Sequence, residues 1–195
     1  IAREDKILKY LDIPLQHCND KILKKMNRRG DKKYLCALLD KLRERIPGLV
    51  LRTSIIAGLP GEGEEEFDEL CDFLREQKLL RAGVFPYSPE EGTRAAKMER
   101  VDSDEAARRA ERIVDIQSEI IDAWNDERQG DVMEVLCEGF DGQSMLFVGR
   151  SYAESPDIDG RIYFSAPRDV AAGEFVPVRI TGAMDGELTG ELAEE

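Results

Sequence analysis

The strongest constraint on the fold is a mostly apolar run at residues 49–57, whose centre and end are rich in β-branched side chains. Such a run predicts a strand that is covered on both faces, as in a parallel sheet. Shorter strands are predicted at 10–15 and 82–88, and helical stripes of apolar residues lie at 22–26, 34–46 and 67–74. This alternation of strands and helices predicts a parallel α/β layer in the first half of the chain.

The pattern changes after residue 100. Residues 104–128 have the apolar spacing of one long helix, which Gly130 ends. Five short runs separated by glycine-rich turns follow at 132–137, 145–149, 161–164, 175–181 and 187–192. They predict a small antiparallel β-barrel. We therefore predict an α/β domain at residues 1–100, a linking helix at 101–130 and a β-barrel domain at 131–195.

Negative charge is concentrated in the predicted barrel. Residues 1–130 carry 24 Lys and Arg against 27 Asp and Glu (net −3), whereas residues 131–195 carry 4 against 14 (net −10). An acidic module repels phosphate backbones, so a basic protein is the expected partner and nucleic acid is not. The alternative is that the charge serves only to keep the protein soluble.

Other global features suggest a cytoplasmic fragment. No run approaches the ~20 apolar residues of a membrane span, and the chain begins at Ile1 within an amphipathic pattern, so we expect a fragment. Its four cysteines form no C-x-x-C pair, which fits a reducing compartment. Cys18, beside His17 on a predicted loop, is the only cysteine whose reactivity merits a test.

Ligands of parallel α/β layers bind at the carboxyl ends of the strands. The first predicted strand ends at Gln16 and His17. In the second, Arg52 and Ser54 share one face, and a buried charge needs a partner or a ligand. We therefore place the ligand on the Arg52 face and the covering helices on the other. His17 could instead be a satisfied loop side chain, and Arg52 could pair with Asp12.

The next segments extend this candidate site. Glu62 ends a glycine-rich turn that permits close backbone approach. Phe85 and Tyr87 place rings at the mouth of the pocket, although Phe85 could be core. Arg28 lies in a basic run, and such a run is usually a solvated helix face. The guanidinium of Arg28 could nevertheless bind a ligand carboxylate through two hydrogen bonds. No Ser/His/Asp arrangement or phosphate loop occurs, so we predict no catalytic or metal-ligating residue.

Several segments together resemble the radical-SAM methylthiotransferase family. Residues 10–17 (Y-L-D-I-P-L-Q-H) and 23–30 (L-K-K-M-N-R-R-G) are similar to its fourth strand and helix. Residues 51–62 (L-R-T-S-I-I-A-G-L-P-G-E) resemble the fifth strand, and 87–93 (Y-S-P-E-E-G-T) the segment after the sixth. Residues 149–160 (G-R-S-Y-A-E-S-P-D-I-D-G) resemble the signature of the TRAM domain. The resemblance implies part of a TIM-like radical-SAM barrel followed by a small TRAM/OB-like barrel.

Within the family, D-I-P-L-Q-H, S-P-E-E-G-T and S-P-D-I-D-G resemble the type that modifies an aspartate of small-subunit ribosomal protein number twelve (RimO-like enzymes). The type that modifies an adenosine in transfer RNA usually shows V-Q-S-G and R-P-G-T at two of these places. The acidic barrel agrees independently with a basic ribosomal-protein substrate. A transfer-RNA methylthiotransferase and a non-catalytic β-barrel binding module are the alternatives.

The resemblance implies a mechanism. An iron–sulfur cluster held by three cysteines cleaves S-adenosylmethionine, and the adenosyl radical takes hydrogen from the β-carbon of the target aspartate. A second cluster, in an N-terminal domain, takes part in sulfur transfer, and another S-adenosylmethionine supplies the methyl group. By position, the resemblance implies that the S-adenosylmethionine cleft is lined by six residues, with two more near its nucleoside end. The six are Gln16, His17, Arg28, Arg52, Ser54 and Glu62, and the two are Phe85 and Tyr87.

The chain also departs from the family pattern. The C-x-x-x-C-x-x-C loop of the family is absent, so we expect both clusters only in the full-length enzyme and the isolated fragment to be inactive. The N-terminal half of the same chain is then an expected partner. Residues 183–190 (A-M-D-G-E-L-T-G) differ from the usual D-Y-D-L ending, with Gly186 where an aromatic residue is expected.

Overall fold

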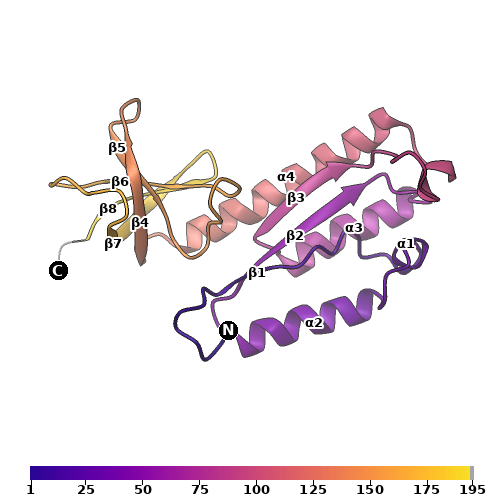
Figure 1. The fold of residues 1–195 in the computed structure, drawn as a ribbon, viewed down its shortest axis with the longest axis horizontal. Coiled ribbons are helices and arrows are strands. Elements are labelled where there is room, and N and C mark those ends of the chain that lie inside the picture. The colour runs from indigo at the N-terminus through magenta and orange to yellow at the C-terminus, as the bar shows by residue number, and fades with distance from the viewer. Residues whose placement is uncertain (194–195) are drawn as a thin grey trace. The chain divides into compact units, whose positions relative to one another are not determined.

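The computed structural model describes residues 1–193. The chain divides into two compact units, Ile1–Ile120 and Ile121–Glu195. Figure 1 labels their elements. Helix α4 (Ser103–Glu127) contributes residues to both units, and it matches the long helix predicted at 104–128.

The first unit contains a three-stranded parallel sheet in the order β1-β2-β3. Its strands are β1 (Tyr10–Asp12), β2 (Val50–Ala57) and β3 (Arg81–Pro86). This confirms the parallel α/β layer. Strand β1 is shorter than predicted because Pro14 has no N–H to donate and the Leu15 N–H bonds to the Thr53 hydroxyl at 3.1 Å. Pairing resumes at Gln16, which bridges to Ile55.

Besides α4, the described part of the first unit contains four helical segments. They are α1 (Asp20–Lys25), α2 (Lys32–Arg45), α3 (Glu64–Gln77) and the short 3₁₀ helix η1 (Ala95–Lys97). Side chains cap two of them: Asn19 accepts hydrogen bonds from the first turn of α1, and Asp31 accepts from Tyr34 N–H at 2.7 Å. At α3 the Glu66 carboxylate accepts from Gly63 N–H at 2.8 Å.

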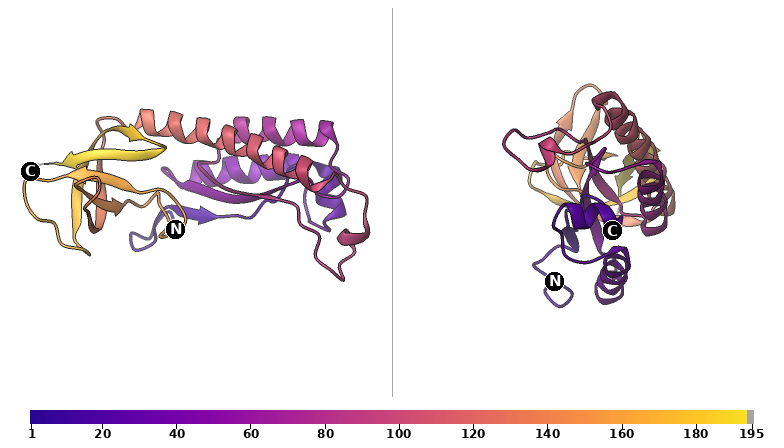
Figure 2. Two further views of the ribbon diagram at one scale, coloured as in Figure 1. Left: turned by 90° about the horizontal axis from the view of Figure 1, so that it is seen from above. Right: turned by 90° about the vertical axis from the view of Figure 1, so that its right-hand side faces the viewer.

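The helices cover one face of the sheet (Figure 2). Leu51, Ile55 and Ala57 of β2 are buried against residues of α1 to α4, whereas Arg52 and Ser54 on the opposite face are partly exposed. The expectation of a strand covered on both faces is therefore wrong within residues 1–193. The run itself indicates this arrangement, since Arg52 and Ser54 share one face. The other face carries Leu51, Ile55, Ala57 and Thr53, a polar residue whose hydroxyl accepts from the Leu15 N–H.

The second unit is a closed barrel in the order β4-β5-β6-β8-β7. The strands are β4 (Val132–Asp141), β5 (Leu146–Arg150), β6 (Ile162–Ser165), β7 (Phe175–Met184) and β8 (Glu187–Leu192). All five runs predicted from the sequence are strands. Every pair is antiparallel except β6 with β8. An odd number of strands cannot alternate in direction all the way round a closed ring, so one parallel pair is required.

Phe164 lies in the barrel core and is fully buried. The Phe147 ring stacks on it, and the two ring centroids are 5.6 Å apart. Trp124, near the end of α4, packs against this core. Asn125 is also buried, and its amide donates to Gly186 O at 2.9 Å. Gly186 (φ +80°) and Asp185 (φ +53°) form the two-residue turn between β7 and β8. A tight Asp-Gly hairpin thus stands where the family pattern expects an aromatic residue.

A buried hydrogen-bonded loop follows β5. Ser151 donates to Glu154 Oε2 from its hydroxyl at 2.7 Å and from its backbone N–H at 2.8 Å. Both residues are about 5% exposed or less. Asp159 accepts from Ser155 N–H at 2.9 Å, and Asp157 has φ +61°. The signature-like segment at 149–160 therefore has a structural role, because its polar residues fold the loop on itself.

Candidate ligand site at the ends of the parallel strands

The carboxyl ends of the three strands meet at one rim. Gln16 N–H donates to Ser54 O at 2.8 Å, and Gln16 O accepts from Ile56 N–H at 2.9 Å. On the other side of β2, Tyr87 N–H donates to Ala57 O at 2.8 Å. Gln16 itself has φ +69°, a conformation that is uncommon for a residue other than glycine. Backbone hydrogen bonds thus hold Gln16 and Tyr87 on either side of β2.

Arg52 lies on the open face of the sheet. Its side chain is 15% exposed, and Nη1 lies 2.6 Å from Asp12 Oδ2. The two residues are register partners across β1 and β2, which places both side chains on the same face. The ion pair considered from the sequence is therefore present. The pair offsets the cost of burying most of the Arg52 guanidinium.

A glycine on β3 lies next to Arg52. Gly83 is the register partner of Ser54 on β3. A Cβ at Gly83 would lie 3.3 Å from the Phe85 ring and 3.5 Å from Arg52 Nη2. Phe85 is 54% exposed, so the alternative that it is a core residue is wrong. The sequence interpretation missed Gly83, although a glycine inside a strand is itself a signal of close approach by other groups.

Tyr87 brings a hydroxyl to the same end of the sheet. Its Oη is buried and has no hydrogen-bond partner among residues 1–193. A buried hydroxyl without a partner costs free energy of about 1–3 kcal/mol. It is therefore a group that a bound ligand could satisfy.

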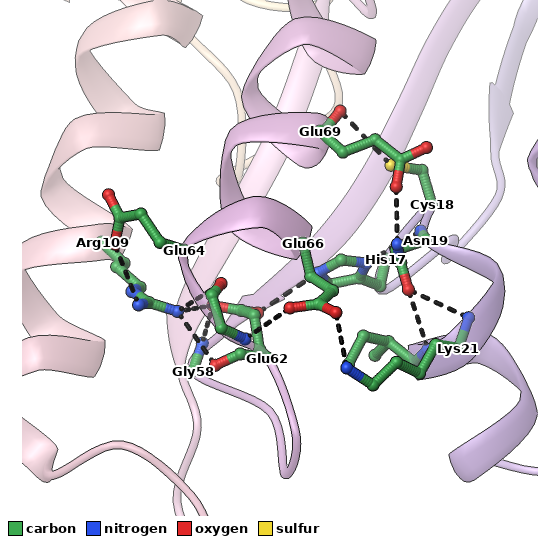
Figure 3. Close-up of polar contacts among 12 residues, drawn as sticks. His17, Cys18, Asn19, Lys21, Gly58, Glu62, Glu64, Glu66, Glu69 and Arg109 are labelled. Carbon is green, nitrogen blue, oxygen red and sulfur yellow. Dashed lines mark hydrogen bonds and ion pairs between the residues drawn. The ribbon is translucent and has the colours of Figure 1, made fainter.

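His17 and Glu62 face each other in a buried polar network rather than on the open face (Figure 3). His17 Nε2 and Glu62 Oε2 are 3.2 Å apart, which is within ion-pair distance. Their approach is not aligned as a hydrogen bond, and neither atom has another partner among the described residues. His17 Nδ1 accepts from Asn19 N–H at 3.0 Å, so the ring proton belongs on Nε2, toward Glu62.

The second oxygen of Glu62 is fully engaged. Glu62 Oε1 accepts from Gly58 N–H at 2.9 Å and from Arg109 Nη1 at 2.9 Å. Burial is the largest influence on the pKa of Glu62 and raises it, but the contacts with His17, Arg109 and Gly58 together lower the pKa below its usual value. Glu62 is thus a buried carboxylate held in its charged form.

Arg109 is the functional candidate that the sequence interpretation missed. It lies on α4, is 6% exposed, and its guanidinium carbon is 5.0 Å from the centre of the Phe67 ring. Its Nε also donates to Glu105 Oε1 at 2.8 Å, one helical turn earlier. A signal was available, since Arg109 lies at helical spacing from Ala106 and Ile113 within the apolar stripe of α4.

The remaining candidates lie elsewhere. Arg28 is exposed on the segment between α1 and α2. Two lysines of the basic run pair with α3, Lys21 with Glu66 at 2.6 Å and Lys32 with Glu69 at 3.1 Å. Cys18 is fully buried, and burial strongly raises the pKa of its thiol. Its test as a reactive cysteine is therefore unpromising, because the thiolate is the reactive form.

The residues present do not fit an iron–sulfur cluster. Within residues 1–193, no group of three or more His, Cys, Asp or Glu side chains is placed to hold a metal ion. Three of the four cysteines, Cys18, Cys71 and Cys137, are buried in the two cores. In the same part of the chain, no helix has both the length and the apolar character needed to cross a membrane.

Comparison with known proteins identifies both units. Residues 2–74 match the Radical SAM superfamily, and residues 130–193 match the TRAM domain. The coproporphyrinogen III oxidase (HemN) of Escherichia coli, a radical SAM enzyme of known structure, has a TM-score of 0.49 and 21% identity. That match covers 57% of this chain and 27% of the oxidase.

Curated relatives match along the whole chain. The identity is 43% over 196 residues to the ribosomal protein uS12 methylthiotransferase RimO of Acetivibrio thermocellus, which covers 100% of this chain and 43% of that protein. It is 47% over 194 residues to the protein of the same name from Pelotomaculum thermopropionicum, covering 98% of this chain and 44% of that protein. The chain thus spans less than half the length of these relatives. It belongs to the radical-SAM methylthiotransferase family.

Proposed function

We propose that this chain is part of an enzyme that methylthiolates an aspartate of ribosomal protein uS12. The observation that carries the proposal is the whole-length similarity to relatives named for that activity, at 43% and 47% identity. The acidic barrel supports the same substrate, because uS12-type ribosomal proteins are basic partners and phosphate backbones are not.

The open face and the rim of the sheet suit S-adenosylmethionine. A planar cation, Arg52, and an aromatic ring, Phe85, both approach the backbone of Gly83 on this face. The buried Tyr87 hydroxyl lacks a partner. We expect these side chains, together with Gln16 and Ser54, to bind and orient the cofactor. That Arg28 binds the cofactor carboxylate stays a prediction from the sequence, since its side chain is exposed between α1 and α2. When bound, S-adenosylmethionine supplies the radical and methyl chemistry of the superfamily.

Two of the predicted site residues take a different part in this proposal. His17 and Glu62 contact each other and the turn after β2 in the buried network. We therefore propose that they support the rim from behind, where they fix backbone groups, rather than contact the cofactor themselves. The iron–sulfur clusters of the family are proposed to be held by other residues of the full-length enzyme, since the cysteines here do not fit one.

The barrel is proposed to contact the basic substrate. Of its four arginines, Arg150 pairs with Glu138 at 2.7 Å and Arg168 pairs with Glu174 at 2.7 Å. Internal pairing of these cations leaves an excess of carboxylates to face a partner. Such an arrangement steers a basic protein by long-range attraction that weakens as salt rises.

Cofactor binding can be tested by calorimetric titration of the chain with S-adenosylmethionine. Arg52→Met is expected to weaken binding at least roughly tenfold, since a charge-assisted contact contributes about 1.5–3 kcal/mol. Arg75→Met is the control, because Arg75 lies on α3 and is 46% exposed beside Asp72. Equal binding by the wild-type chain and the Arg52→Met variant would contradict the assignment.

Substrate choice can be tested by titrating the chain with uS12 and with transfer RNA over a range of salt concentrations. We expect binding of uS12 that weakens with salt, and much weaker binding of transfer RNA. Preferential, steeply salt-dependent binding of transfer RNA would instead favour the transfer-RNA type of methylthiotransferase.

A further inference from the structure

Arg109 is buried and charged, yet it is not among the residues proposed to contact the ligand. We propose that Arg109 is a positioning residue that sets the shape of the ligand rim from α4, by holding Glu62 and, through it, Gly58 and His17 (Figure 3). The identity of the ligand rests on the proposed function, whereas the positioning role rests on the contacts that follow.

One guanidinium nitrogen of Arg109 donates hydrogen bonds to three oxygen atoms of the turn that follows β2. Arg109 Nη1 donates to Glu62 Oε1 at 2.9 Å, to Glu62 O at 3.2 Å and to Gly63 O at 3.3 Å. The Nε contact with Glu105 anchors the same guanidinium to its own helix. The turn between β2 and α3 is therefore tied to α4 by a side chain 47 residues further along the chain.

Glu62 links this contact to the end of β2 and to the segment after β1. Gly58, whose N–H donates to Glu62 Oε1, is the first residue after β2. Its φ is +81°, and a Cβ there would lie 2.6 Å from the Ala106 Cβ of α4, so the turn and the helix are closely packed. Glu62 Oε2 faces His17, the residue after Gln16. A single cation is thus linked, through Glu62, to the end of β2 and to the segment that follows β1.

Charge explains why this contact controls the geometry. Glu62 is 3% exposed, and a buried carboxylate that loses its cation must find another partner or move toward water. Either response displaces the turn and releases Gly58. Arg108 provides a matched comparison, because it is adjacent on α4 and pairs with Glu105 at 2.8 Å but is 63% exposed.

The test uses the whole chain and compares Arg109→Met, Arg109→Lys and Arg108→Met. The chain has one histidine, so its ring signals in ¹⁵N NMR belong to His17 without ambiguity. We expect Arg109→Met to shift the His17 ring signals and the Gly58 amide signal and to speed exchange of the Nε2 proton. Arg109→Lys, which keeps the charge, is expected to restore part of each, and Arg108→Met to change neither.

Binding of S-adenosylmethionine is the second readout. We expect it to weaken at least roughly tenfold in Arg109→Met and to stay within about twofold of wild type in Arg108→Met. Unchanged His17 and Gly58 signals in Arg109→Met would overturn the positioning role, and so would unchanged binding in a variant whose signals have shifted. If Arg109→Met does not fold, the same criteria apply to Arg109→Lys. Failure of the wild-type chain to bind S-adenosylmethionine, with the expected signal changes present, would instead count against the proposed function alone.

Discussion

The two units differ in whether the edges of their outer strands are paired. The barrel closes its five strands on themselves, so its polar backbone is paired all the way round, and its core lies inside. Among residues 1–193, the parallel sheet has three strands, its two outer strands pair with no further strand, and helices cover one of its faces. The comparison suggests that the closed unit contributes mainly stability and that the open unit provides the site for chemistry. The closed unit buries its polar signature residues in its own loop, whereas the open unit carries Arg52, Gly83 and Phe85 on the face that we propose binds the ligand.

Each unit also has its own spectroscopic reporter. The single tryptophan, Trp124, packs on the barrel core, and the single histidine, His17, lies at the rim of the sheet. Changes confined to one unit can therefore be distinguished from changes that spread through the chain.

The largest loss of stability is expected when a large side chain is removed from the barrel core. Phe164→Ala removes a fully buried ring and its stacking on Phe147, and it is expected to lower the free energy of unfolding of the barrel by about 3–5 kcal/mol. Urea unfolding followed by Trp124 fluorescence measures this loss. The NMR signals of His17 are expected to keep their wild-type midpoint. Equal shifts of both reporters would show that the two units unfold as one.

A smaller loss is expected from the buried loop after β5. Ser151→Ala removes the hydroxyl that donates to Glu154 and accepts from Ala153 N–H, so the variant should be about 1–3 kcal/mol less stable. Ser144→Ala is the control, because the Ser144 hydroxyl also bonds a carboxylate, that of Asp141, but does so on the exposed β4–β5 turn. Similar losses in the two variants, measured by Trp124 fluorescence, would refute a structural role for the signature segment.

The next largest loss of stability is expected at the β7–β8 hairpin, which departs from the family pattern. Gly186→Ala forces a Cβ into a left-handed conformation and is expected to cost about 1–2 kcal/mol of barrel stability. Gly142→Ala in the β4–β5 turn is the control, because a Cβ there would meet nothing within 4 Å. Thermal unfolding should show a lower midpoint for the first variant only. No difference between them would mean that the turn relaxes without strain.

The smallest effect is expected at the surface of the open unit. The Lys21 ammonium, and then the Gly63 N–H, hold the pKa of Glu66 at about 2, below its usual 4.5. Because the pKa is lower in the folded state, this contribution is complete above about pH 4.5 and is lost as pH falls toward 2. Lys21→Met should therefore reduce stability by about 0.2–1 kcal/mol at pH 6, and by less at pH 2.5. A loss independent of pH would exclude the ion pair as its cause.

Most of the fold was predictable because it follows from local periodicity. The run at 49–57 became β2, and the five barrel runs became strands, since alternation of side chains is a property of consecutive residues. The parity of Arg52 and Ser54 placed them on the open face for the same reason. Closure of the barrel with one parallel pair depends on the meeting of β6 and β8, for which the local pattern carries no signal.

The candidate site was predicted only in part. The ends of the strands were placed correctly, because parallel pairing brings them to one edge. The inward orientation of Glu62 and His17 was not predicted. Glu62 pairs with Arg109, which lies on a helix far along the chain, and His17 faces Glu62 in turn. Local patterns identify which residues share an edge, and long-range charge pairing decides which of them turn toward the interior.

The most direct test of the central claim, that the open sheet and not the barrel holds the cofactor, is one NMR titration of the whole chain with S-adenosylmethionine. The account predicts that signals of Gln16, Gly58 and Tyr87 shift in saturable fashion, while the Trp124 indole N–H does not move. Shifts confined to the barrel, or saturable binding that leaves the rim signals unchanged, would contradict it.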